Sequence, residues 1–122
     1  MLGDIKLNTM RIELKKFGEI LVSRPSGKDA YLAMSAYVTK NVGKSEPIEV
    51  DFAGVKVMTP SWADEVITKL ANEFENIKLV NTGNPTVQST IKTLKEYSGL
   101  KTNSGNVKKK TPKKMLKKEK RK

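Results

Sequence analysis

The chain has 122 residues, a length that suits one ordinary domain, and it contains neither cysteine nor histidine. These absences exclude disulfides, thiol nucleophiles, imidazole bases and the usual zinc, copper and haem ligands, so we expect no metal site and no cofactor. The net charge is +11, but residues 1–100 hold 13 Lys or Arg against 12 Asp or Glu, whereas residues 101–122 hold 11 against one acidic residue, so the signal for polyanion binding belongs to the C-terminal segment.

The first strand is predicted over residues 10–16, where apolar and charged residues alternate as in a half-buried strand. A turn at 17–19 leads into the short apolar run 20–22, which we interpret as the return strand of an N-terminal hairpin. Further upstream, Ile5 and Leu7 indicate an additional edge strand.

A helix is predicted over residues 27–41, because Arg24 precedes Pro25 and is biased towards an extended conformation. Ser26 is the expected N-cap of this helix. Its apolar face is formed by residues at spacings of three and four, namely Ala30, Met34, Tyr37 and Val38.

The central strand of the predicted sheet begins after Pro47, alternates through 48–52 and resumes at Val55 and Val57. A second helix is expected to follow the break at Thr59 and Pro60, with Ser61 as its cap. Its apolar stripe recurs every four residues, at Trp62, Val66, Leu70 and Phe74.

The last predicted strand is 77–80, and Asn84 then caps a helix that has Pro85 at its first position. Val87, Ile91 and Leu94 form the apolar stripe of that helix. The resulting fold class is α/β, a mixed sheet with an N-terminal hairpin and about three packing helices, in which the last two strands are parallel. The expected domain covers 1–100, followed by a disordered lysine-rich tail over 101–122.

The segment 50–65, Val-Asp-Phe-Ala-Gly-Val-Lys-Val-Met-Thr-Pro-Ser-Trp-Ala-Asp-Glu, resembles the strand, loop and helix start of STAS-like domains, which are relatives of anti-sigma-factor antagonists and largely of unassigned function. Phe17-Gly18 and the stretch 21–24 resemble the same family, and the similarity in element order extends over 10–97. The resemblance implies a non-enzymatic regulatory module that binds a protein partner, either an ATPase-type switch kinase or another regulator.

The resemblance also places the partner-binding surface around the start of the helix after the central strand. The residues that it implies there are Thr59, Ser61, Trp62, Asp64 and Glu65. In the better-known antagonists a serine at this helix start is phosphorylated, and the matching position here is Pro60. Ser61 or Thr59 can stand in, because a phosphate at a helix N-terminus meets free backbone N–H groups, although Asp64 and Glu65 would repel it.

Structural explanations exist for the same residues. Ser61 and Asp64 form an ordinary helix cap with a favourable first-turn charge, and Trp62 suits the buried stripe. Asp51, with Asn81, Thr82 and Asn84, lies where ligands gather beyond strand ends, but these side chains also suit loop hydrogen bonds. Arg24 either pairs with Asp51 or is solvated.

The tail is either a solubilising extension or a contact for RNA, DNA or an anionic membrane surface. Its candidate polyanion-binding residues are Lys108, Lys109, Lys110, Lys113, Lys114, Lys117, Lys118, Lys120, Arg121 and Lys122. Without interleaved aromatic residues, such binding should be salt-sensitive and blind to sequence. The alternative function is therefore a nucleic-acid-binding accessory protein that acts mainly through the tail. With no long apolar run and no signal peptide, the expected location is cytoplasmic.

Overall fold

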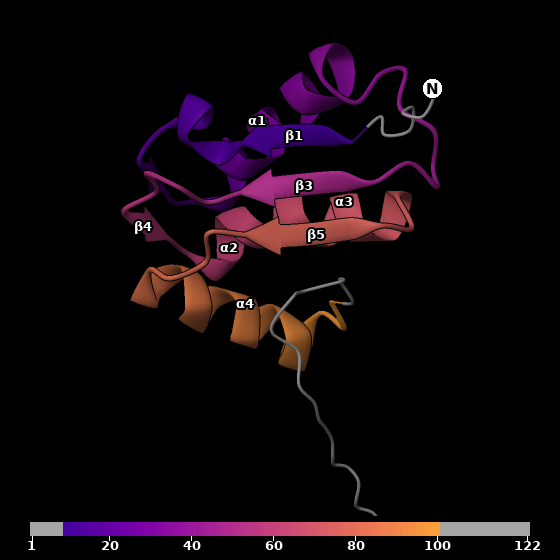
Figure 1. The fold of residues 1–122 in the computed structure, drawn as a ribbon. Coiled ribbons are helices and arrows are strands. Elements are labelled where there is room, and N and C mark those ends of the chain that lie inside the picture. The colour runs from indigo at the N-terminus through magenta and orange to yellow at the C-terminus, as the bar shows by residue number, and fades with distance from the viewer. Residues whose placement is uncertain (1–8, 101–122) are drawn as a thin grey trace, which may run out of the picture.

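The computed structural model describes residues 9–100, and its centre is a three-stranded parallel sheet (Figure 1). The sheet is formed by β1 (Met10–Glu13), β3 (Ile48–Asp51) and β5 (Ile77–Val80), in the order β1-β3-β5. Met10 lies opposite Ile48, and Ile48 lies opposite Ile77. The predicted central strand and its parallel pairing with the last strand are therefore confirmed.

The N-terminal hairpin is a wrong prediction. β2 (Ile20–Leu21) pairs in parallel with β4 (Val57–Met58), and β1 pairs in parallel with β3 rather than with β2. A 3-10 turn, η2 (Leu14–Phe17), ends β1 early, and Gly18 then bends the chain with φ 131°. Alternation in the sequence indicates a strand but does not say which strand it pairs with. The segment also contains no Asn-Gly or Asp-Gly pair of the kind that closes a two-residue hairpin.

Three helical segments pack around the sheet. They are α1 (Arg24–Tyr37), a continuous segment over 60–73, and α4 (Pro85–Tyr97). The middle segment consists of α2 (Pro60–Ala63), the π-helical stretch η3 (Asp64–Thr68) and α3 (Lys69–Glu73). Figure 1 shows α1, α2 and α3 behind the strands and α4 beyond β5, while no helix of residues 9–100 lies on the front face of the sheet. The α/β class with about three packing helices is confirmed.

The hydrophobic core lies between the strands and these helices. The predicted stripes of the second and last helices are buried, with Trp62 and Leu70 fully inaccessible to solvent. In α1, Ala30 and Met34 are buried as expected, whereas Tyr37 is 87% exposed. The helix ends at Tyr37 instead of continuing to residue 41, so this side chain is left at the rim of the domain.

Two helix caps lie upstream of their predicted positions, and each time a proline is the reason. Ser23 caps α1, accepting a hydrogen bond from the Ser26 N–H, and Thr59 occupies the N-cap position of α2 in place of Ser61. Pro25 and Pro60 lie inside the first turns, where a missing N–H costs no hydrogen bond. The predicted cap at Asn84 is confirmed, because its side chain accepts from two backbone N–H groups.

Two predictions lie outside the described residues: the edge strand at Ile5 and Leu7, and the lysine-rich tail. Within 9–100, no helix combines the length and the apolar character that crossing a bilayer requires.

Candidate partner-binding site

The start of the second helical segment is pressed against the first turns of α1. Gly27 makes this close approach possible, since a Cβ atom at this position would lie 2.6 Å from the carbonyl oxygen of Trp62. It would also lie 3.1 Å from the Cβ atom of Glu65. The first turn of α1 and the helix start at 60–65 therefore form one continuous surface.

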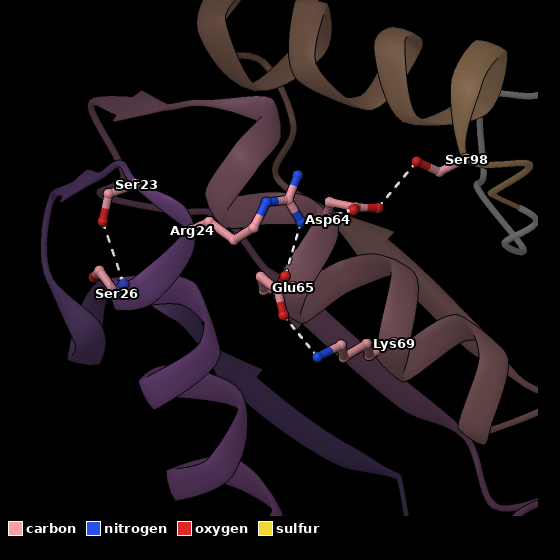
Figure 2. Close-up of polar contacts among 7 residues, drawn as sticks. All are labelled: Ser23, Arg24, Ser26, Asp64, Glu65, Lys69 and Ser98. Carbon is pink, nitrogen blue, oxygen red and sulfur yellow. Dashed lines mark hydrogen bonds and ion pairs between the residues drawn. The ribbon is translucent and has the colours of Figure 1, made fainter.

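An ionic cluster joins the helices on this surface (Figure 2). Nη1 of Arg24, in α1, lies 2.8 Å from Oε2 of Glu65 and 3.0 Å from Oδ2 of Asp64. Nζ of Lys69 lies 2.6 Å from the other carboxylate oxygen of Glu65. The hydroxyl of Ser98, just after α4, donates to Asp64 at 3.0 Å. The cluster thus ties together α1, the segment 60–73 and the end of α4.

The cluster keeps its carboxylates ionised. Hydrogen bonds from Lys69 and Arg24 lower the pKa of Glu65, whose side chain is only 11% exposed. Burial opposes ionisation of Asp64, but hydrogen bonds from Arg24 and Ser98 outweigh it, so its pKa is also lowered. Hydrogen bonds to the two carboxylates raise the pKa of Arg24 in turn. Because all four charges are compensated, the cluster is suited to recognition by shape and hydrogen bonding rather than to proton transfer.

A second contact continues the cluster along α1. The hydroxyl of Tyr31 donates to the carboxylate of Glu73, and Nζ of Lys69 lies 5.7 Å from the centre of the Tyr31 ring. Burial, together with the hydrogen bond to Glu73, raises the pKa of Tyr31 to about 12. These contacts hold α1 against α3, next to the ionic cluster.

Some of the residues predicted for the partner-binding surface are accessible in the structure, and others are buried. Ser61 is exposed at the helix start, and Asp64 and Glu65 belong to the ionic cluster. Trp62 is 0% exposed and belongs to the core, in agreement with its structural interpretation. The hydroxyl of Thr59 is buried and has no hydrogen-bond partner among the described residues, and it does not cap the helix.

Sequence reasoning missed Arg24, Lys69 and Ser98 as members of this site. Lys69 had a detectable signal, because it follows Glu65 by one helical turn. Ser98 and Arg24 had none, since their contacts span 34 and about 40 positions along the chain. The expectation that Arg24 pairs with Asp51 or stays solvated is wrong.

Asp51 belongs to a separate cluster on the open face of the sheet. Its carboxylate accepts hydrogen bonds from Asn81 at 2.8 Å, from the Ala53 N–H at 2.9 Å and from Arg11 at 2.9 Å. These contacts, chiefly the hydrogen bond from Asn81, lower the pKa of Asp51. Asn84 instead donates to the carbonyls of Val55 and Lys56. The structure therefore favours the loop-bonding interpretation of these residues.

Comparison with known proteins finds a family model that matches part of the chain. The family model for a STAS-like domain of unknown function (DUF4325) matches residues 36–87. Over this segment, which is less than half of the chain, the sequence is similar to that STAS-like family. This confirms the resemblance drawn from the central strand and the helix start. No curated protein and no solved structure matches the chain.

The segment matched by the family model includes the helix start at 59–65 and Lys69, but not Arg24 or Ser98. The site therefore combines residues inside the matched segment with residues on either side of it. Within 9–100, no group of three or more acidic residues is arranged to hold a metal ion. What the geometry offers is an accessible serine beside a compensated ionic cluster.

Proposed function

We propose that this STAS-like domain is a regulatory module that binds a protein partner through the helix-start face. The face is defined by Ser61, Asp64, Glu65 and Arg24. The observation that carries the proposal is the exposed Ser61 beside a cluster in which Arg24, 52% exposed, is positioned by two carboxylates. A positioned guanidinium next to a small polar side chain presents fixed donors to a partner at low cost in side-chain entropy.

The function is proposed to be non-enzymatic. The chain has no cysteine or histidine, and the acidic side chains that it brings into clusters are bound to cations, Asp51 to Arg11 and Asp64 to Arg24. Neither arrangement leaves a carboxylate with the raised pKa that suits a general acid.

The proposed partner is an ATPase-type switch kinase or another regulator. For phosphorylation, Ser61 is the better site, because its side chain is exposed whereas the hydroxyl of Thr59 is buried. A phosphate on Ser61 would compete with Asp64 and Glu65 for Arg24, and it would add negative charge beside both carboxylates. Modification would thereby change the charge of the face and release a bound partner.

The test is a quantitative pull-down with the full-length chain as bait in native lysate. Ser61→Arg should lower recovery of the partner by about tenfold or more, because a long cationic side chain would occupy the centre of the face. Ser45→Arg is the matched control, since Ser45 is exposed in the turn before β3, remote from the helix start. The mass of the recovered bait reports any phosphate on Ser61.

The proposal fails if every partner retained by the unmodified chain is also retained by Ser61→Arg and by Arg24→Ala. Circular dichroism of both variants excludes unfolding as a trivial cause of lost binding. Retention by Ser61→Arg with loss by Arg24→Ala would move the interface towards α1 and contradict the central role of Ser61.

A second candidate function is nucleic-acid binding through residues 101–122. It is favoured by the distribution of charge, since this segment carries 11 of the 24 Lys and Arg residues and only one acidic residue. In this proposal the tail supplies attachment to a polyanion, and the STAS-like domain, with nearly balanced charge, positions the tail or the partner.

A further inference from the structure

The outer edge of β1 is open along the described chain. β1 pairs with β3 on one side, and the N–H of Met10 donates to the carbonyl of Pro47 at 3.1 Å, so Met10 and Ile12 direct their backbone groups towards β3. Alternate residues of a strand face opposite sides. The backbone groups of Arg11 therefore face outwards, as does the N–H of Glu13. Such an edge is a template for another strand.

The side chains of Arg11 and Glu13 at this edge are both charged, but they differ in how many contacts they make. Arg11 donates to Glu49 at 2.8 Å and to Asp51 at 2.9 Å, which leaves other N–H groups of its guanidinium available. Glu13 is exposed, and within residues 9–100 its carboxylate has no hydrogen-bond or ion-pair partner. Because both residues alternate with the buried Ile12, their side chains lie on the face of the sheet opposite the core.

Two-fold antiparallel pairing of this edge with itself has few possible registers. Arg11 can face its own copy, Glu13 can face its own copy, or Arg11 can face the partner's Glu13. The first two place like charges opposite each other, which is destabilising. The third forms two Arg–Glu pairs by symmetry and places Ile12 against the partner's Ile12 on the helix-covered side. Charge complementarity therefore selects a second copy of this chain and one register.

We propose that β1 pairs antiparallel with β1 of a second copy, Arg11 opposite the partner's Glu13, to form a continuous six-stranded sheet. The interface contains none of the residues of the helix-start face. It is thus independent of the proposed function and leaves that face free in each copy.

The flank of this edge fits the same arrangement. A groove of about 480 Å³ runs beside Met10, with Tyr37, Val38 and Val42 among its lining residues. Tyr37 lies on the side of α1 turned away from Tyr31, because six residues at about 100° each place the two rings some 120° apart. Tyr31 contacts α3, whereas the 87% exposed Tyr37 lines the groove together with Met10, at the start of β1, where a second copy would cover it.

The proposal is tested by sedimentation of the full-length chain over a concentration series up to about 1 mM, a range that detects weak association. We expect a monomer–dimer equilibrium. Glu13→Arg, which places arginine opposite the partner's Arg11, should weaken association by about tenfold or more. Glu96→Arg changes charge equally at an exposed position of α4 and should leave association unchanged.

Hydrogen exchange provides the second readout. The amides of Arg11 and Glu13 should become protected as the concentration rises, and Glu13→Arg should abolish that change. A chain that stays monomeric throughout the series overturns the proposal, and so does a dimer that Glu13→Arg leaves intact. If both amides are protected in a monomer, the edge is covered by something other than a second copy.

Discussion

Gly27 is the residue at which α1 comes closest to the segment that carries the candidate site. The atoms facing it are backbone atoms of Trp62, which cannot rotate away as the end of a flexible side chain would. The absence of a side chain here determines how closely the helices pack, and thereby where Arg24 lies relative to Glu65. Although glycine lowers intrinsic helix stability, packing outweighs propensity at this position.

Gly27→Ala should therefore destabilise the domain. A Cβ atom 2.6 Å from the carbonyl oxygen of Trp62 forces the helices apart, at a cost of about 1–3 kcal/mol. The gain in helix propensity, about 1 kcal/mol, offsets this only in part. Urea denaturation monitored by the fluorescence of Trp62 measures the difference in the free energy of unfolding.

The control for this substitution is Gly83→Ala, because no atom lies within 4 Å of a Cβ atom built at Gly83. It should leave the midpoint of unfolding unchanged or raise it slightly. An unchanged midpoint for Gly27→Ala would show that the close approach of the helices does not constrain the packing.

At the scale of elements, proline explains both the correct and the displaced helix starts. Pro25, Pro60 and Pro85 each lie in the first turn of a helix. Taking proline as the first helical residue predicts the cap at Asn84 correctly. Taking it as a break before the helix puts the caps at Ser26 and Ser61, downstream of the proline, whereas the N-cap residues are Ser23 and Thr59. Placing proline at the first helical position gives the starts of α2 and α4, whereas Pro25 lies at the second position of α1, after Arg24.

Asn84 joins the start of α4 to the chain before β4. Its side-chain oxygen accepts from the N–H groups of Thr86 and Val87, and its amide donates to the carbonyls of Val55 and Lys56. Asn84→Ala removes both functions and should lower the free energy of unfolding by about 1–2 kcal/mol. Thermal unfolding followed by circular dichroism measures this loss.

Asn84→Ser separates the two contributions of Asn84, because a hydroxyl retains the capping acceptor but does not reproduce the amide donor. Its loss should be smaller than that of Asn84→Ala. Gln88→Ala, at an exposed position of the same helix, should be nearly neutral. Equal losses for the alanine and serine variants would assign the whole effect to the contacts with Val55 and Lys56.

Local sequence patterns predict the helices and strands better than they predict which strands pair with each other. The apolar stripes of the segment 60–73 and of α4, the central position of β3 and its parallel pairing with β5 are all readable from periodicity and element order. The parallel placement of β1 and β2 is not, because strand pairing depends on contacts distant in sequence. The ionic cluster was predicted only in part for the same reason: Arg24 reaches Asp64 across 40 positions.

At the scale of the whole molecule, the charge is divided unevenly along the chain. Residues 1–100 are nearly neutral, so long-range attraction for a polyanion must come from residues 101–122. The two proposed functions therefore depend on different parts of the chain and can be separated by truncation.

The full-length chain should bind a short RNA and a DNA duplex with affinity that falls steeply with salt and without preference for sequence. A truncation ending at Leu100 should lose this binding, because lysine contacts to phosphates supply it. Fluorescence anisotropy across a salt series measures both proteins, and the pull-down partner serves as the control for an intact domain. Unchanged affinity at low salt after truncation would contradict the role of the tail.

The pairing of β1 with β3 and of β3 with β5 also bears on how the chain folds. The two strands of each pair are about 30–40 residues apart in the sequence, and at least one helix lies between them. With neither strand pair closed by a short turn, the sheet gains no early local nucleus, and loop-closure entropy must be overcome before the first ladder forms. The transition state for folding should therefore contain α1 or the segment 60–73 already packed on β3, and folding should be slower than in a helical bundle of the same length.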